Sequence, residues 1–194
     1  MIIDPSHKLI IITAPSGAGK TSITRHLLKK FPDELIFSVS ATTREPRKYE
    51  QNGIDYYFMS QKEFTHKIQH EEFVEWEMVY EGKYYGTLKS ELQRIWSKNK
   101  IPLLDVDVKG AIHIQQQSPD NALSIFIEPP SIDELQKRLT LRGSEKTESM
   151  QARISKAAYE ISFQHSFDHV IINKNLEQAF QEAETVVREF IESS

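Results

Sequence analysis

A glycine-rich loop between an apolar segment and a helical pattern constrains the fold most strongly. Residues 8–13 are apolar and β-branched, residues 14–20 are rich in glycine, and Ile23, Leu27 and Leu28 then recur at helical spacing. This order is the beginning of a βα unit. A continuous apolar strand followed by a helix is typical of a mostly parallel sheet that helices cover on both faces. The sequence therefore predicts an α/β fold.

Three later segments repeat this alternation of strand and helix. Short apolar runs at residues 101–106, 123–127 and 169–172 are each followed by helical periodicity, which extends the predicted parallel sheet. Two helix starts are marked by capping boxes, S-Q-K-E at residues 60–63 and S-I-D-E at residues 131–134. In such a box the hydroxyl and the carboxylate each bond a free backbone N–H, so a helix is expected to begin there.

The predicted core is interrupted twice. Residues 37–87 are rich in Tyr and Phe and contain N-G and E-G turn signals, which indicates a small inserted β-rich lobe. Residues 142–149 are polar and lie between two helical patterns, as expected for a short lid. The 194 residues are expected to form one domain. Its parts are the core at about 1–36, 88–137 and 156–194, the lobe at about 37–87 and the lid at about 138–155.

Composition excludes several classes of function. The chain contains no cysteine, which rules out disulfides, thiolate zinc sites, iron–sulfur clusters and thiol nucleophiles. Its net charge is −4, so it has no overall positive field for a nucleic-acid polymer or an anionic membrane. No apolar run approaches the ~20 residues that cross a bilayer, and the first residues lack the pattern of a signal peptide. We therefore expect a cytoplasmic protein, a monomer or a small homo-oligomer, that binds only small polyanions.

The glycine-rich loop has the residues that bind a polyphosphate. Its sequence, A-P-S-G-A-G-K-T, matches G-x-x-x-x-G-K-[ST] except at the first position. Between a strand and a helix, its backbone N–H groups face the phosphates, and its lysine and threonine are expected to contact the β- and γ-phosphates and Mg²⁺. The alternative is an ordinary glycine-rich turn. The predicted nucleotide-binding residues are Ala14, Pro15, Ser16, Gly17, Ala18, Gly19, Lys20 and Thr21.

Two further segments carry charged groups suited to this chemistry. Asp105 and Asp107 end an apolar strand, at the edge where parallel strands form a ligand crevice. One of them is expected to hold Mg²⁺, and the alternative is that both only terminate the strand. Residues 38–47 combine four hydroxyl groups with Arg44 and Arg47. Paired arginines suit a phosphate dianion because each offers planar bidentate donors, although a solvated turn is the alternative.

The order of short motifs along the chain resembles that of guanylate kinases. The motifs are A-P-S-G-A-G-K-T, S-V-S-x-T-T-R-x-P-R, D-Y-x-F, F-V-E-W, Y-Y-G-T, L-D-V-D-x-x-G and R-x-x-x-R-G, and they cover most of the chain. The resemblance implies a P-loop parallel sheet core with an inserted GMP-binding lobe and a short helical lid. It also implies an ATP:GMP phosphotransferase of purine nucleotide metabolism, which moves the γ-phosphoryl group of MgATP directly to GMP and yields ADP and GDP.

The matching residues take their expected roles from this family. Guanine presents N–H donors at N1 and N2, which carboxylates can accept, whereas adenine would leave these acceptors unpaired. By similarity, Arg44, Arg47, Tyr56 and Tyr85 hold the GMP phosphate, and Ser40, Glu75, Thr87 and Asp107 bind the guanine. The implied catalytic residues are Lys20, Arg44, Arg138, Arg142 and Arg153, with Thr21 and Asp105 at Mg²⁺ and Asn173 near the adenine of ATP.

Other interpretations remain open on the sequence alone. Tyr56 and Tyr85 are also typical of a lobe core, Glu75 of a solvated strand, and Arg153 of a helix surface. Two other functions share some of these motifs. One is a small kinase with a different acceptor, such as a phosphorylated sugar, and the other is a guanylate-kinase-like scaffold domain that binds protein partners without catalysis.

The chain departs from the common family pattern at two places in the predicted lobe. Tyr49 stands before Glu50 where the family usually has glycine, so the geometry of that loop is open. Residues 75–84 are one residue longer than usual. We expect the tip of this hairpin to differ while Tyr85 and Thr87 keep their places.

Overall fold

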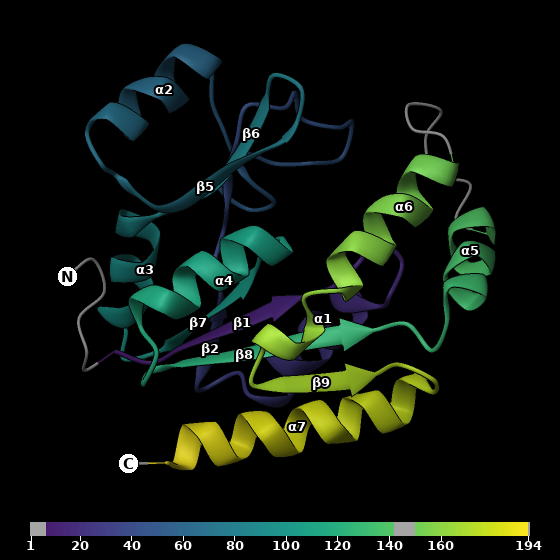
Figure 1. Cartoon of the computed structure of the whole chain (residues 1–194). Coiled ribbons are helices and arrows are strands. Elements are labelled where there is room, and N and C mark those ends of the chain that lie inside the picture. The colour runs from purple at the N-terminus through teal and green to yellow at the C-terminus, as the bar shows by residue number, and fades with distance from the viewer. Residues whose placement is uncertain (1–6, 142–149, 194) are drawn as a thin grey trace.

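The core of the protein is a parallel β-sheet (Figure 1). The computed structural model describes residues 7–141 and 150–193. Within these residues the core sheet has five strands in the order β2-β7-β1-β8-β9, and every neighbouring pair is parallel. The strands are β1 (Leu9–Thr13), β2 (Leu35–Phe37), β7 (Ile101–Asp105), β8 (Ala122–Glu128) and β9 (His169–Ile172). The predicted parallel α/β core is confirmed.

Helices cover both faces of this sheet because successive strand residues are buried on opposite sides. Ile10 and Ile12 of β1 pack in one cluster with α1 and α7, whereas Leu9 and Ile11 pack with α3 and α4 on the other face. A strand that is buried on both faces has a continuous apolar sequence, which explains why residues 8–13 show no polar alternation. The helices are α1 (Lys20–Lys30), α3 (Lys89–Trp96), α4 (Val108–Gln117) and α7 (Leu176–Glu192).

A second sheet forms a smaller lobe, seen above the core in Figure 1. Its strand order is β4-β3-β6-β5, with β3 and β4 parallel and the other pairs antiparallel. The lobe has its own apolar cluster, in which Phe64 is fully buried and stacks on Phe73 at a ring-centroid distance of 4.4 Å. The elements are β3 (Ala41–Thr42), β4 (Tyr57–Phe58), α2 (Gln61–Gln69), β5 (Phe73–Tyr80) and β6 (Lys83–Leu88). The predicted β-rich lobe is present.

Two helices lie beside the core, on the side where the strands of the core sheet end (Figure 1). Leu135 and Leu139 of α5 (Ile132–Leu141) pack against Ala157 of α6 (Met150–Ile161). The predicted lid joins these helices through residues 142–149, which lie outside the described residues. A short 3₁₀ helix, η1 (Gln164–Ser166), leads from α6 toward β9. No helix in the described part of the chain has the length and apolarity to span a membrane.

Both helix starts predicted from capping boxes are confirmed. The hydroxyl oxygen of Ser60 accepts a hydrogen bond from the backbone N–H of Glu63 at 3.1 Å, and α2 begins directly after it. Ser131 accepts from the backbone N–H of Glu134 at 3.1 Å, and α5 follows. Each bond satisfies a donor that has no partner within its own helix, which fixes the residue at which the helix begins.

The β5–β6 hairpin accommodates the extra residue that the sequence predicts. Its cross-strand pairs are Glu75 with Thr87, Glu77 with Tyr85, Met78 with Tyr84, and Tyr80 with Lys83. The register therefore shifts between Met78 and Tyr80, and Val79 is the additional residue. A β-bulge takes up one residue without moving the pairs behind it. Tyr85 pairs with Glu77, and Thr87 pairs with Glu75 next to a second register shift, between Phe73 and Glu75.

We predict that Phe64→Ala lowers the free energy of unfolding by about 3–5 kcal/mol, as is usual when a fully buried aromatic ring is truncated. Trp76→Ala is the matched control, because Trp76 is an aromatic residue of the same lobe that is 41% exposed. It should cost less than half as much. Urea unfolding followed by far-ultraviolet circular dichroism measures both losses, and equal losses would contradict the assignment of Phe64 as the centre of the lobe.

Candidate active site

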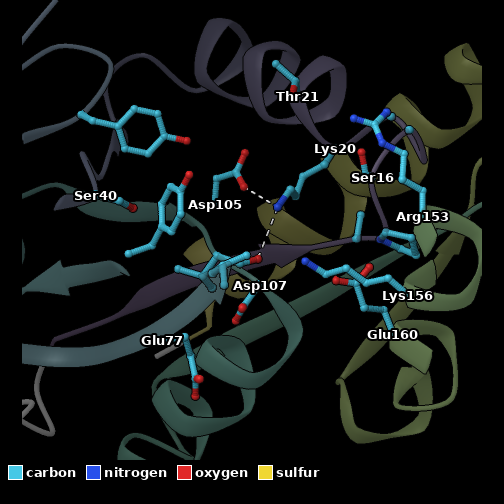
Figure 2. A pocket seen from close by; sticks show the side chains of 18 of the residues that line it. Ser16, Lys20, Thr21, Ser40, Glu77, Asp105, Asp107, Arg153, Lys156 and Glu160 are labelled. Atoms are coloured by element: carbon cyan, nitrogen blue, oxygen red, sulfur yellow. Dashed lines mark hydrogen bonds and ion pairs between the residues drawn. The ribbon is translucent and has the colours of Figure 1, made fainter. Parts of the chain in front are cut away.

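A cavity of about 360 Å³ lies between the glycine-rich loop, the carboxyl ends of β1 and β7, the lobe strands and α6 (Figure 2). It brings together residues that are distant in sequence. The predicted site residues that line it are Ala14, Pro15, Ser16, Gly17, Gly19, Lys20, Thr21, Ser40, Tyr56, Glu75, Tyr85, Asp105, Asp107 and Arg153. Predicted phosphate-binding and base-binding residues therefore face one shared space.

The loop has the backbone geometry of a phosphate cradle. Gly17 and Gly19 have φ values of 91° and 107°, a region that residues with a side chain rarely adopt. A Cβ atom at Gly19 would lie 2.2 Å from the Nδ2 atom of Asn173, so glycine is also required by packing. Gly19 is the N-cap of α1, and Lys20, Thr21 and Ser22 of its first turn line the cavity. Ala14 is buried, and it is not among the described non-glycine residues with positive φ, so alanine fits where the motif has glycine.

Lys20 is held in the cavity by a carboxylate at the end of β7. Its Nζ atom lies 2.5 Å from Oδ1 of Asp105 and donates to the carbonyl oxygen of Val106 at 3.3 Å (Figure 2). Burial by itself lowers the pKa of Lys20, but the charge and hydrogen bond of Asp105 outweigh it and raise the pKa above its ordinary value. Lys20 is therefore a fixed positive charge at the end of the loop.

Two carboxylates converge at the start of α4, on the lobe side of the cavity. Asp107 is the N-cap of α4 and accepts from the backbone N–H of Gly110 at 2.8 Å. Glu75 of β5 is 5% exposed, and its Oε1 atom accepts from the hydroxyl of Thr87 at 2.7 Å. A Cβ atom at Gly110 would lie 2.8 Å from Oε2 of Glu75 and 3.2 Å from Oδ1 of Asp107. Glycine at this position therefore allows both carboxylates to approach the helix.

Burial perturbs the ionisation of Glu75. Loss of hydration raises its pKa to about 7, the hydrogen bond from Thr87 opposes the shift, and the nearby charge of Asp107 adds to it. A carboxyl group whose pKa lies near neutrality, in a cavity and beside a second carboxylate, is characteristic of a functional site. The side chain of Thr87 does not reach the cavity in the described structure, and it acts on the site through Glu75.

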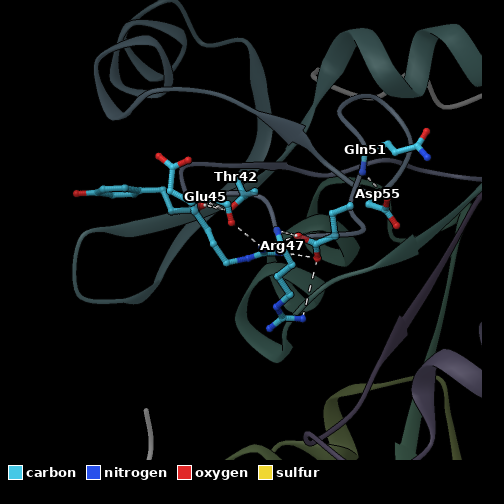
Figure 3. A network of polar contacts seen from close by, with 8 residues as sticks. Thr42, Glu45, Arg47, Gln51 and Asp55 are labelled. Atoms are coloured by element: carbon cyan, nitrogen blue, oxygen red, sulfur yellow. Dashed lines mark hydrogen bonds and ion pairs between the residues drawn. The ribbon is translucent and has the colours of Figure 1, made fainter. Parts of the chain in front are cut away.

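Arg44 is held by an acidic side chain of the loop that follows β3. Its Nη1 and Nη2 atoms donate to Glu50 at 2.7 and 2.9 Å, and its guanidinium group lies 5.1 Å from the ring centroid of Tyr56. Glu50 also accepts from the backbone N–H of Arg47 at 2.7 Å, within the polar network of Figure 3. The hydrogen bonds of Arg44 lower the pKa of Glu50 to about 2 and raise the pKa of Arg44. Neither arginine is among the described residues that line the cavity.

Tyr49 does not disturb this loop. It is 85% exposed. The non-glycine residues with positive φ in the described chain are Glu71 and Asn99, so Tyr49 has a backbone conformation that any residue adopts. The loop therefore needs no glycine before Glu50.

Asn173 and Arg138 lie behind the glycine-rich loop. The side-chain amide of Asn173 is buried and donates to the carbonyl oxygen of Ala18 at 2.7 Å. Arg138 donates to the carbonyl oxygen of Asn173 at 3.1 Å and to Oε1 of Glu134 at 3.3 Å. In the described structure neither Asn173, Ala18 nor Arg138 lines the cavity, and Arg142 lies outside the described residues.

Several lining residues were not singled out by the sequence. They are Ser22, Glu77, Val79, Gly86, Val106, Lys156 and Glu160. The sequence spacing of three of these residues relates them to predicted site residues. Glu77 alternates with Glu75 along β5, and Lys156 and Glu160 follow Arg153 at helical spacing, so each shares a face with a predicted site residue. Figure 2 shows Arg153, Lys156 and Glu160 on the α6 side of the cavity.

Comparison with known proteins agrees with this architecture. The family model described as guanylate kinase matches residues 6–190. A guanylate kinase of Porphyromonas gingivalis is 48% identical over 95% of this chain and 98% of its own length, and one of Chlorobium chlorochromatii is 44% identical over 98% of this chain and 100% of its own length. The crystal structure of guanylate kinase from Anaplasma phagocytophilum superposes with a TM-score of 0.75 at 27% identity, covering 100% of this chain and 91% of that one. The chain belongs to the guanylate kinase family.

Proposed function

We propose that the cavity is the active site in which this guanylate kinase transfers the γ-phosphoryl group of ATP to GMP, with ADP and GDP as products. One observation carries the assignment of the site. A phosphate cradle with its charged lysine, the buried carboxylate of Glu75 and the carboxylate of Asp107 line the same cavity. Phosphoryl transfer needs the donor phosphates and the acceptor in line and shielded from water.

The glycine-rich loop is the donor side of the site. Its backbone N–H groups and the N-terminus of α1 bind the phosphates of ATP, and Lys20 neutralises charge on the transferred group. Arg153 faces the same space from α6, and by family resemblance Arg138 and Arg142 are further cations of this side. Cations on this side offset the charge that spreads over the transferred group. By family resemblance Asn173 remains a candidate residue for the adenine end of ATP. Its hydrogen bond to Ala18 supports a role in holding the glycine-rich loop in position.

The donor set fits a magnesium ion that arrives with ATP. The hydroxyl of Thr21 and the carboxylate of Asp105 both line the cavity, and Mg²⁺ prefers oxygen ligands, with one or two from the protein and the rest from phosphate and water. In residues 7–141 and 150–193 no group of three or more His, Cys, Asp or Glu side chains could hold a metal alone. Magnesium supplies further charge neutralisation at the phosphates.

The lobe is the acceptor side. Glu75 and Asp107 accept from the N1 and N2 donors of guanine, and Ser40 and Thr87 add hydroxyl groups beside them. Adenine has no N–H at N1, so it would leave a buried acceptor unpaired, which is the strongest basis for rejecting a substrate. A sugar phosphate acceptor makes no use of this carboxylate pair.

The GMP phosphate is bound between two tyrosines and the arginines of the lobe. Tyr56 and Tyr85 line the cavity with ring centroids 6.0 Å apart, and Arg44 packs over the ring of Tyr56. Burial raises the pKa of Tyr56, so its hydroxyl stays protonated and can donate. Arg47 adds a second guanidinium group nearby. A phosphomonoester has its second pKa near ~6, so the attacking oxygen is largely unprotonated at pH 7 and needs no general base.

The net charge of the chain bears on which classes of partner the protein binds. A net charge of −4 supports small nucleotides as its polyanionic partners, with no nucleic-acid polymer and no membrane. We propose a monomer or a small homo-oligomer. We place the protein in the cytoplasm, together with its nucleotide substrates.

We predict that Glu75→Gln and Asp107→Asn each lower kcat/KM for GMP by about 10²-fold or more, while KM for ATP changes little. Asn at position 107 still caps α4, so that variant removes an acceptor without removing the cap. Glu72→Gln is the control, because Glu72 lies in the same lobe and pairs with Lys67 outside the cavity.

A coupled ADP-release assay with GMP, AMP, CMP and UMP measures these effects. Unchanged GMP turnover in both site variants would remove them from base recognition. ADP release by the wild type with another acceptor would overturn the base assignment, and no release with any acceptor would favour the non-catalytic scaffold alternative.

The raised pKa of Glu75 predicts proton release on GMP binding. The ordinary pKa is 4.5 and the pKa in the ligand-free protein is about 7, so at pH 6 the free enzyme carries the proton, whereas the guanine donors require the ionised acceptor. Binding at pH 6 should release about one proton more from the wild type than from Glu75→Gln, and this difference should vanish at pH 8. Titration calorimetry in buffers of different ionisation enthalpy measures it. Any proton that the phosphate of GMP releases is the same in both proteins. Equal proton release by the two proteins would therefore refute the assignment of Glu75 to guanine binding.

Asp105→Asn should raise the Mg²⁺ concentration for half-maximal rate by about 10-fold or more, since partners of a bound metal commonly contribute that much to its affinity. Asp120→Asn, at an exposed residue outside the cavity, is the control and should leave the Mg²⁺ dependence unchanged. ADP release at saturating nucleotides over a range of Mg²⁺ concentrations is the measurement. Identical Mg²⁺ curves for all three proteins would exclude Asp105 from the metal site.

A further inference from the structure

A buried carboxylate outside the cavity joins the lobe to the core. Glu91 lies in the first turn of α3, the helix that begins directly after the lobe strand β6, and is 2% exposed. It is not among the described residues that line the cavity. A carboxylate is rarely buried unless it is paired and hydrogen-bonded, so its partners indicate its role.

Four hydrogen bonds occupy the two oxygens of Glu91. Oε1 accepts from the backbone N–H of Val39 at 3.0 Å and from Nη2 of Arg94 at 2.7 Å. Oε2 accepts from the hydroxyl of Tyr57 at 2.9 Å and from Nε of Arg94 at 2.8 Å. The carboxylate has about four acceptor positions, and all of them are used.

Arg94 lies in the same helix as Glu91, and the other two partners belong to separate segments of the lobe. Val39 lies on the connection that leaves the core after β2, and Tyr57 lies in β4. Glu91 itself lies on the return connection, four residues after Thr87. One carboxylate therefore ties both connections between core and lobe to a lobe strand.

Its helix is anchored in the core. Leu92, the next residue of α3, is fully buried in the cluster that contains Leu9, Ile11 and Leu104 of the core sheet. The hydrogen bonds of Glu91 therefore hold the lobe segments relative to the core sheet, and not only relative to each other.

Each lobe partner of Glu91 is adjacent in sequence to a cavity residue. Val39 precedes Ser40, and Tyr57 follows Tyr56, and both Ser40 and Tyr56 line the cavity. In an extended segment successive side chains point to opposite sides. The side chain of Tyr57 bonds Glu91 on the α3 side, so Tyr56 is directed at the cavity, and the backbone bond of Val39 fixes the chain position of the adjacent Ser40.

The carboxylate of Glu91 stays ionised within this hydrogen-bond network. Burial raises the pKa of Glu91, but the hydrogen bonds of Arg94, Val39 and Tyr57 outweigh burial, and the pKa lies below its ordinary value. An ionised group in such a place is stable only while its partners remain. Loss of one partner therefore perturbs the whole connection.

We infer that Glu91 is a positioning residue for the acceptor half of the active site, acting through Val39 and Tyr57 to place Ser40 and Tyr56. This inference rests on the proposed binding of GMP between lobe and core. The hydrogen bonds and ion pairs of Glu91 and Tyr57 and the bond of the Val39 N–H, within the described residues, include none to the glycine-rich loop. The consequence is specific to one substrate: GMP binding depends on Glu91, and ATP binding does not.

Steady-state kinetics of Glu91→Gln and Tyr57→Phe test the inference. Tyr57→Phe removes one hydrogen bond and keeps the ring, while Glu91→Gln keeps the shape and removes the charge. We expect KM for GMP to rise about 10-fold or more in Glu91→Gln and by a smaller factor in Tyr57→Phe, because small displacements of binding groups have large effects. KM for ATP should stay within about twofold in both variants.

The matched control is Glu184→Gln. Glu184 accepts from His26 at 2.6 Å and pairs with Lys30 at 2.9 Å, so the same substitution breaks an ion-paired carboxylate between α1 and α7, far along the chain from the lobe. Both KM values should stay unchanged in this variant. A rise of KM for GMP there would show that general destabilisation, and not lobe position, produces the effect.

Two outcomes separate this inference from the function on which it rests. Unchanged KM for GMP in both lobe variants, or an equal rise of both KM values, overturns the role of Glu91 while GMP-dependent ADP release by the wild type continues. Absence of that release in the wild type overturns the proposed function itself. If Glu91→Gln does not fold, Tyr57→Phe decides by the same criterion.

Discussion

The contact between Asn173 and the glycine-rich loop is the interaction on which the donor side of the site depends. Asn173 directly follows β9; its backbone N–H donates to the carbonyl oxygen of Glu128 in β8 at 2.8 Å, and its side chain donates to the carbonyl oxygen of Ala18 at 2.7 Å. Arg138 bonds the carbonyl oxygen of the same residue. Because buried polar groups keep their hydrogen bonds, the loop, the sheet and α5 are fixed relative to one another. The direction of α1 and the position of Lys20 follow from this.

The cavity gathers cations around the glycine-rich loop, which helps an acidic chain to bind two polyanions. Lys20, Arg153 and Lys156 line this part together with Asp105 and Glu160, and Glu75 and Asp107 lie on the proposed base side. Burial of Glu75 has a free-energy cost, seen in its pKa of about 7. Only a ligand that donates to this carboxylate offsets the cost, so under the proposed role of Glu75 the same desolvation that destabilises the empty site favours a base with N–H donors.

The sequence predicts those parts of the protein whose structure is determined by residues that are close together in the chain. The strand, loop and helix of residues 8–30 follow from apolar periodicity and from glycines that take positive φ, and the capped helix starts follow from neighbouring side chains. Tertiary contacts are not visible in this way. Glu91 and Arg94 read as an ordinary i, i+3 ion pair on a helix surface, because the bonds to Val39 and Tyr57 arise only when the lobe folds back on α3. Asn173 is placed near ATP by resemblance alone, and its bond to Ala18 required the structure.

Base recognition and lobe position depend on one stretch of chain. Thr87 bonds Glu75 inside the lobe, and four residues later Glu91 bonds Val39 and Tyr57 at the junction with the core. Thr87 and Glu75 pair in the same lobe sheet, so they move together when the lobe moves relative to the core. Under the proposed roles, binding of guanine to Glu75 favours the lobe position that the Glu91 network stabilises, since a ligand shifts an equilibrium toward the state it binds more tightly. The proposed base-binding carboxylate and the proposed positioning carboxylate are then linked by the short stretch of chain from Thr87 to Glu91.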